Sequence, residues 1–197
     1  MKRTAAQLAA VLFAGCVSLP ISESTPPGPY GAALDKATRR ATLYSSLETR
    51  AFVRATYLSP EFITAQAAEI SRLRAEPAEQ AAARLARMRE ENKAPGFFVA
   101  LHTPEKSWND WNEPNSVWRL AADVGKGEID KPKIQRVERP DAETLALYPY
   151  LDSFSVGYVL RFEGSGPAAD GGRVRLMAAG ALGQIRLEWA QPVAGSR

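Results

Sequence analysis

The strongest constraint on the fold is a change in the spacing of apolar residues near Pro95. Before this proline, apolar side chains recur every three or four positions, which is typical of amphipathic helices. After Gly96 they alternate with polar side chains, which is typical of strands with one buried face. The chain is therefore expected to combine a helical first half with a β-rich second half in an α+β fold.

Two helices are predicted in the first half. Apolar positions along residues 33–58 fall on one helical stripe, which predicts a long amphipathic helix. Ser59 is a suitable N-cap for a second helix over residues 60–92. Pro77 should break that helix, because proline has no amide hydrogen to donate. We expect residues 31–93 to form a helical hairpin.

The second half, residues 94–197, is predicted to form an antiparallel β-sandwich. The clearest strand spans residues 154–162, where apolar and polar side chains alternate, and a Gly-rich loop follows at residues 164–172. The expected strands cover residues 97–101, 117–124, 134–137, 154–162, 174–176 and 185–189. We expect this sandwich to pack beside the helical hairpin, with an immunoglobulin-like arrangement as one option and the strand order open.

The N-terminus has the layout of a secretory signal. Lys2 and Arg3 precede an apolar stretch at residues 5–13, and about nine residues are too few for a transmembrane helix, which needs about 20. Residues Phe13-Ala14-Gly15-Cys16 resemble the lipobox of bacterial lipoproteins, with phenylalanine in place of the usual leucine. The alternatives are an ordinary secretory signal in which Cys16 is incidental, and an uncleaved cytoplasmic protein.

The lipoprotein resemblance implies a specific processing. Residues 1–15 would be removed as the signal peptide and Cys16, the one cysteine of the chain, would carry lipid. Residues 16–30, which are rich in proline and serine, would form an extended tether. Val17 follows the cysteine where lipoproteins kept on the inner membrane often have aspartate. The resemblance thus implies a location on the outer membrane, facing the periplasm.

The charge balance gives no indication of a nucleic-acid partner. The chain has 25 Lys and Arg against 22 Asp and Glu. Removal of Lys2 and Arg3 with the signal leaves 23 against 22, a net charge of +1. This excess is too small for binding to a phosphate backbone.

The most unusual segment in the β half, residues 107–115, combines tryptophans with oxygen-bearing side chains. Its candidate ligand-binding residues are Trp108, Asp110, Trp111, Asn112 and Glu113. Exposed tryptophans beside such polar groups would suit a sugar ligand, whereas buried tryptophans, with Trp118, would fill the end of the sandwich. A calcium site of the EF-hand type is not supported, because the sixth position from Asp110 is not glycine.

Catalytic signals are weak. The one histidine, His102, stands at the end of a predicted strand with Ser107 and Asp110 nearby, but the G-x-S-x-G pattern of a nucleophile elbow is absent. No catalytic residue, metal or cofactor is predicted. The leading hypothesis is a non-enzymatic envelope lipoprotein that binds another envelope component, a protein first and a glycan second. The competing hypothesis is an envelope hydrolase that uses His102, Asp110 or Glu113, and a third is a structural spacer.

Overall fold

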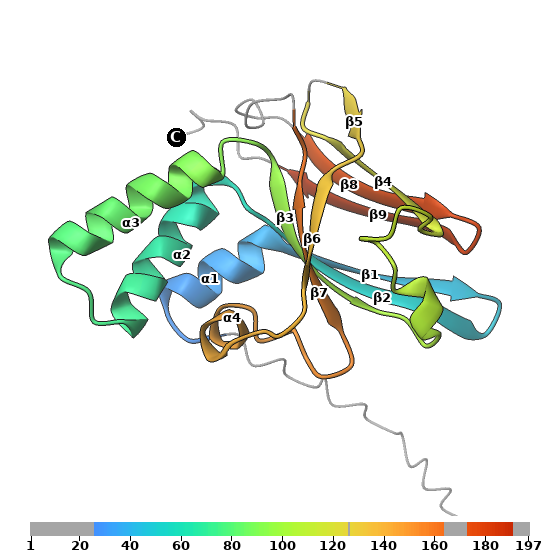
Figure 1. The fold of residues 1–197 in the computed structure, drawn as a ribbon, viewed down its shortest axis with the longest axis horizontal. Coiled ribbons are helices and arrows are strands. Elements are labelled where there is room, and N and C mark those ends of the chain that lie inside the picture. The colour runs from blue at the N-terminus through green and yellow to red at the C-terminus, as the bar shows by residue number, and fades with distance from the viewer. Residues whose placement is uncertain (1–25, 126, 164–172, 191–197) are drawn as a thin grey trace, which may run out of the picture.

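The computed structural model describes residues 26–125, 127–163 and 173–190. Helices and strands both contribute to this part of the chain, which confirms the predicted α+β class (Figure 1). The elements are α1 (Pro29–Ala37), β1 (Thr38–Ser45), β2 (Glu48–Tyr57), α2 (Pro60–Leu73), α3 (Ala78–Glu91), β3 (Gly96–His102), a short 3₁₀ turn (Lys106–Trp108), β4 (Trp118–Asp123), β5 (Glu128–Asp130), β6 (Lys133–Val137), α4 (Ala142–Leu147), β7 (Val156–Arg161), β8 (Arg173–Gly180) and β9 (Gly183–Ala190).

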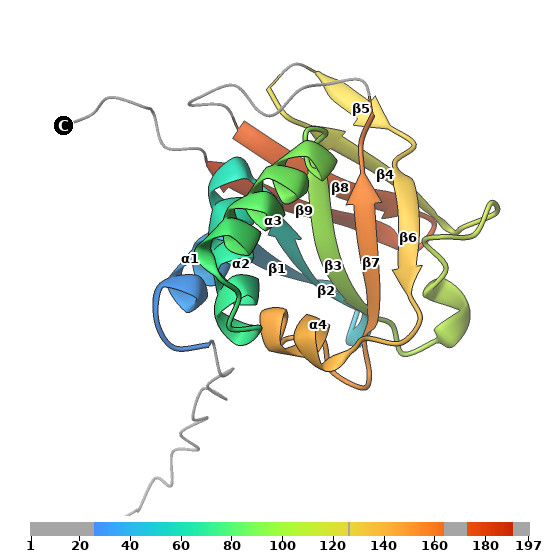
Figure 2. The same ribbon diagram turned by 60° about the vertical axis from the view of Figure 1, so that its left-hand side comes forward.

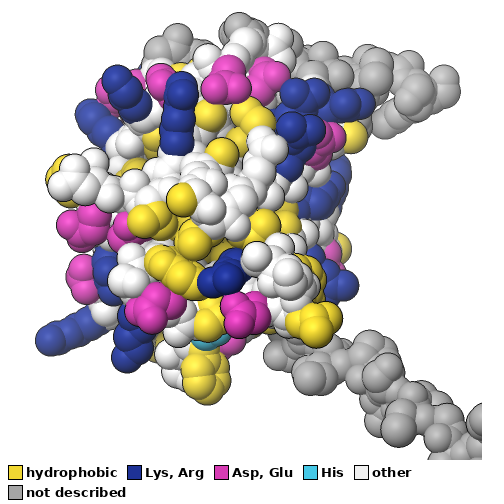
Figure 3. Space-filling model, turned by 90° about the vertical axis from the view of Figure 1, so that its right-hand side faces the viewer, with side chains coloured by type: hydrophobic (Ala, Val, Ile, Leu, Met, Phe, Trp, Pro, Cys, Tyr) yellow, Lys and Arg dark blue, Asp and Glu magenta, His cyan; other side chains and the backbone are white. Residues whose placement is uncertain are grey.

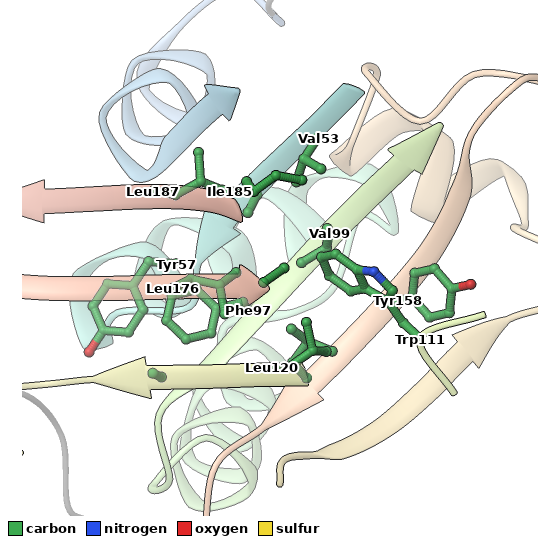
Figure 4. Packing of buried hydrophobic residues seen from close by; sticks show 14 of the residues in the cluster. Val53, Tyr57, Phe97, Val99, Trp111, Leu120, Tyr158, Leu176, Ile185 and Leu187 are labelled. Atoms are coloured by element: carbon green, nitrogen blue, oxygen red, sulfur yellow. The ribbon is translucent and has the colours of Figure 1, made fainter. Parts of the chain in front are cut away.

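The strands of the described region form two stacked antiparallel sheets (Figure 2). The five-stranded sheet has the order β1-β2-β3-β7-β6, and the four-stranded sheet has the order β5-β4-β8-β9. Their facing sides bury the main hydrophobic core, in which Tyr158 and Leu160 of β7 lie against residues of both sheets. Figure 4 shows part of this cluster, including Val53, Tyr57, Phe97, Val99, Trp111, Leu120, Leu176, Ile185 and Leu187.

The helices cover the outer face of the five-stranded sheet, where they enclose a second core (Figure 2). β3 is buried on both faces, because Phe97 and Val99 point into the main core while Phe98 and Ala100 belong to the helix-side core. α2 packs on this face and α3 packs on α2. None of the helices in the described segments is long and apolar enough to cross a membrane.

The predicted helix over residues 33–58 is wrong beyond residue 37. α1 ends at Ala37, and residues 38–57 form the β1–β2 hairpin of the five-stranded sheet. The physical reason is that residues 52–57 of β2 pair with β3, and such long-range pairing overrides weak local propensity. The region 31–93 therefore contributes two strands to the sandwich, and the helical hairpin consists of α2 and α3.

The local helix signals after residue 58 are confirmed. The Ser59 hydroxyl accepts the Phe62 amide at 3.1 Å and caps α2, as expected from its position before Pro60. Pro77 stands between the two helices and is the N-cap residue of α3. The break at this proline lets α3 fold back on α2.

Candidate functional site

The structure places the predicted tryptophan cluster mainly in the core. Trp111 is 2% exposed and stacks on Tyr158, with ring centroids 5.7 Å apart. Trp118 is also buried, and its indole nitrogen donates a hydrogen bond to the carbonyl oxygen of Trp108 at 2.8 Å. Trp108 is half-buried beneath the guanidinium of Arg50, which lies 5.1 Å from its ring centroid. Trp111 and Trp118 therefore pack in the core and are not exposed for contact with a sugar.

The polar residues of the same loop mostly hold its shape. The carboxylate of Asp110 accepts hydrogen bonds from the Ser116 hydroxyl and the Val117 amide, both at 2.9 Å. Glu113 accepts a hydrogen bond from the Asn112 side-chain amide at 2.8 Å. Asn112 and Glu113 line a hollow of about 450 Å³ beside β4 and β6. Among the described residues, no group of three metal-ligating side chains is close enough to hold an ion.

The described contacts of His102 do not involve the other residues of the hydrolase hypothesis, Asp110 and Glu113. Its Nδ1 donates a hydrogen bond to the carbonyl oxygen of Phe154 at 2.8 Å. Ser107 instead donates its hydroxyl to Glu105. His102 and Glu113 line different hollows. The contacts described for these side chains thus give no acid–base pair or triad with His102.

His102 lines a hollow of about 510 Å³ on the outer face of the five-stranded sheet, which we call the sheet-face groove. Strands β1, β2 and β3 form its floor, and the segment between α4 and β7 forms one wall. Its side chains include Arg40, Thr42, Phe52, Arg54, Ala100, His102, Tyr150, Asp152, Phe154 and Ser155. Figure 3 shows apolar side chains among charged ones on the face of the molecule that lies to the right in Figure 1.

Strand register brings the floor residues together. Arg54 of β2 lies opposite Arg40 on one side and Ala100 on the other. Two residues before Arg54 on the same strand, Phe52 lies opposite Thr42 on one side and His102 on the other. Residues two apart on a strand share a face, so both rows point away from the main core.

Buried tyrosines hold the wall of the groove on the sheet. Tyr148 stacks on Phe98 with ring centroids 3.7 Å apart. The hydroxyl groups of Tyr150 and Thr56 share a hydrogen bond of 2.6 Å, and burial raises the pKa of Tyr150 well above its usual value. Phenols of this kind remain neutral at physiological pH and act as fixed packing groups. The segment that follows, with Asp152 and Phe154, is thereby positioned over the sheet.

The sheet-face groove was missed from the sequence for a specific reason. Arg40, Phe52 and Arg54 fall inside the region predicted as helix, and Phe154 falls at the start of the strand predicted over residues 154–162. In the structure β7 begins at Val156, and Phe154 is 76% exposed. The alternation of apolar and polar residues over β2 was the available signal for the strand.

The chain was compared with family models, curated proteins and solved structures, and none of them matches it.

Proposed function

We propose that this chain is an envelope lipoprotein, anchored through lipid on Cys16, most simply in the outer membrane facing the periplasm. Cys16 lies outside the described residues, so the proposal is supported by the sequence around it. The sequence begins with a positively charged end, continues with a short apolar stretch and then has a single cysteine after Phe13-Ala14-Gly15. Two acyl chains would hold the protein firmly on a membrane.

The anchoring proposal can be tested by metabolic labelling with radioactive palmitate. Wild-type protein should incorporate the label and stay with the membrane after a high-salt wash. Cys16→Ser should lose both properties, because serine supplies no thiol for lipid attachment. Equal labelling and equal membrane association of the two proteins would contradict the proposal.

We infer further that the folded domain binds another envelope component, a protein in the first place, at the sheet-face groove. The observation that carries this inference is the exposure of two large aromatic side chains at the groove, Phe52 at 45% and Phe154 at 76%. Solvent exposure of large apolar groups around a hollow is typical of binding surfaces. Aromatic anchors of this kind supply much of the binding energy of protein interfaces.

Site-specific photo-crosslinking tests the location. With p-benzoylphenylalanine at position 154, illumination of intact envelopes should give discrete adducts with a partner protein. The matched control places the same group at Leu145 on α4, which is 42% exposed and outside the groove. Equal adduct patterns at both positions, or none from position 154, would refute the groove as the contact site.

A glycan ligand is the second candidate, and one observation favours it. In the hollow beside β4, the side-chain oxygen of Asn112 is buried and has no hydrogen-bond partner among the described residues. A sugar hydroxyl would supply the missing donor. Retention on a column of cell-wall polysaccharide should be lost in Asn112→Ala and kept in Asn115→Ala, since Asn115 does not line this hollow.

A further inference from the structure

The floor of the sheet-face groove concentrates positive charge. Arg40 and Arg54 occupy directly opposed positions on β1 and β2, an arrangement that destabilises a sheet by repulsion when nothing offsets it. Arg54 interacts with other groups of the protein. Arg40 is exposed, and its guanidinium has no hydrogen bond or ion pair within the described part of the chain. Its charge is therefore available to a ligand.

The one carboxylate that lines the groove, Asp152, does not pair with Arg40. Asp152 uses its Oδ1 to accept the Phe154 amide at 3.0 Å, which closes a turn in the wall. It forms no ion pair with Arg40 among the residues that the structure describes. The positive charge of Arg40 therefore has no partner among the described residues, so that an acidic ligand complements this side of the groove.

An apolar rim lies next to the arginines. The rings of Phe52 and His102 are 5.8 Å apart, and those of His102 and Phe154 are 6.4 Å apart, so that the three form a continuous aromatic row. Both phenylalanines are exposed. A ligand that complements this surface needs an apolar group close to its acidic group.

We propose that the sheet-face groove binds an acidic segment of a protein partner, with a partner carboxylate on Arg40 and an apolar side chain against Phe52 and Phe154. The proposal rests on the proposed function of this groove and adds the chemistry of the partner. An arginine fork matches a carboxylate with two parallel hydrogen bonds. A hollow with a floor of three strands and a wall formed by a loop suits a peptide chain in extended conformation, whose alternating side chains can reach both the floor and the wall.

The probe for this proposal is a fluorescein-labelled random copolymer of glutamate and tyrosine, which carries acidic and aromatic side chains on one chain. Fluorescence anisotropy measures its binding to the full chain in detergent micelles. Wild-type protein should bind it, and Arg40→Gln should weaken binding about tenfold, which corresponds to the loss of one charge-assisted contact. Arg40→Lys should fall between the two, because lysine keeps the charge and loses the fork.

The control variant is Arg87→Gln, which removes an exposed arginine of α3 outside the groove and should bind as wild type does. Polyglutamate, which lacks the aromatic groups, should bind more weakly than the mixed copolymer. No binding by wild type, or an equal loss in Arg40→Gln and Arg87→Gln, would overturn the proposal. Phosphatidylglycerol vesicles that bind in an Arg40-dependent way would overturn it in favour of a lipid.

The envelope contact at the groove and the acidic character of the partner can be refuted separately. The copolymer assay uses purified protein and reports the charge chemistry of the groove without an envelope partner. Absence of crosslinks from position 154, together with normal copolymer binding, would reject the envelope contact alone. Crosslinks that persist unchanged in Arg40→Gln would reject the acidic partner and keep the contact.

Discussion

The turn between β1 and β2 offers a decisive test of the fold, because one substitution should change stability in opposite directions in a hairpin and in a helix. Ser46 stands at the tip of the hairpin with a φ of 55°, in the left-handed region. Glycine adopts this region without steric cost. In a continuous helix over residues 33–58, the same glycine would stand in the interior and would destabilise the protein.

The magnitude follows from the backbone conformation. A left-handed backbone costs a non-glycine residue roughly 1–2 kcal/mol, and the greater freedom of glycine in the unfolded chain returns about 0.5–1 kcal/mol of this. Ser46→Gly should therefore raise the free energy of unfolding by about 0.5–1 kcal/mol. In a helix interior, the change from serine to glycine would lower it by about 0.5 kcal/mol.

Urea unfolding, followed by circular dichroism, measures the difference. Ala68→Gly is the matched control, because Ala68 is exposed in the interior of α2 and its replacement should cost about 1 kcal/mol. Ala75→Gly should stabilise, since Ala75 follows α2 with a φ of 49°. A decrease in the urea midpoint for Ser46→Gly, comparable to that for Ala68→Gly, would refute the β1–β2 hairpin.

Three further outcomes are expected. Arg84 donates hydrogen bonds to Glu76 and lowers the pKa of that carboxyl from 4.5 to about 2. The resulting stabilisation is complete above pH 4.5 and disappears as the pH falls towards 2. The difference in urea midpoint between wild type and Glu76→Gln should therefore shrink between pH 6 and pH 2.5. Tyr158→Phe should lower the free energy of unfolding by about 1–2 kcal/mol, because the Tyr158 hydroxyl lies 2.8 Å from Asn109 Oδ1 in a mostly buried position, and urea unfolding measures this loss. Phe154→Ser should change the free energy of unfolding by no more than about 0.5 kcal/mol, because the ring of Phe154 is 76% exposed. A thermal scan measures this effect, and a large decrease in the melting temperature would show that the ring supports the fold.

The α+β class and the ends of α2 and α3 could be predicted because their signals are local. Ser59 and Pro77 act through their own backbone and side-chain chemistry, whatever surrounds them. The β1–β2 hairpin could not be predicted from the three-and-four spacing, because small apolar residues such as Ala51 and Ala55 fit a helical stripe and a strand face equally well. Pairing with β3 decides between them, and that pairing joins segments far apart in the sequence.

The candidate site was harder to predict than the fold for a related reason. The tryptophans of the loop after β3 carried the clearest chemical signal, and the structure uses Trp111 and Trp118 for packing. The sheet-face groove depends instead on the register of three strands and on a loop that crosses them. No stretch of sequence contains Arg40, His102 and Phe154 together, so only the folded chain brings them to one surface.

The position of the groove follows from how far the helices extend over the sheet. Along the outer face of β3, Phe98 and Ala100 are buried by the helix-side core, whereas His102, two residues further on, is half exposed. The groove therefore begins where the cover of the helices ends, and the segment after α4 forms its wall. A partner that fills it would extend the second core along the same strand face, and the apolar area it buries at Phe52 would add to the stability of the hairpin. Binding should thus raise the melting temperature with the logarithm of partner concentration above the dissociation constant, and a partner that binds without this effect would have to bind the unfolded chain equally well.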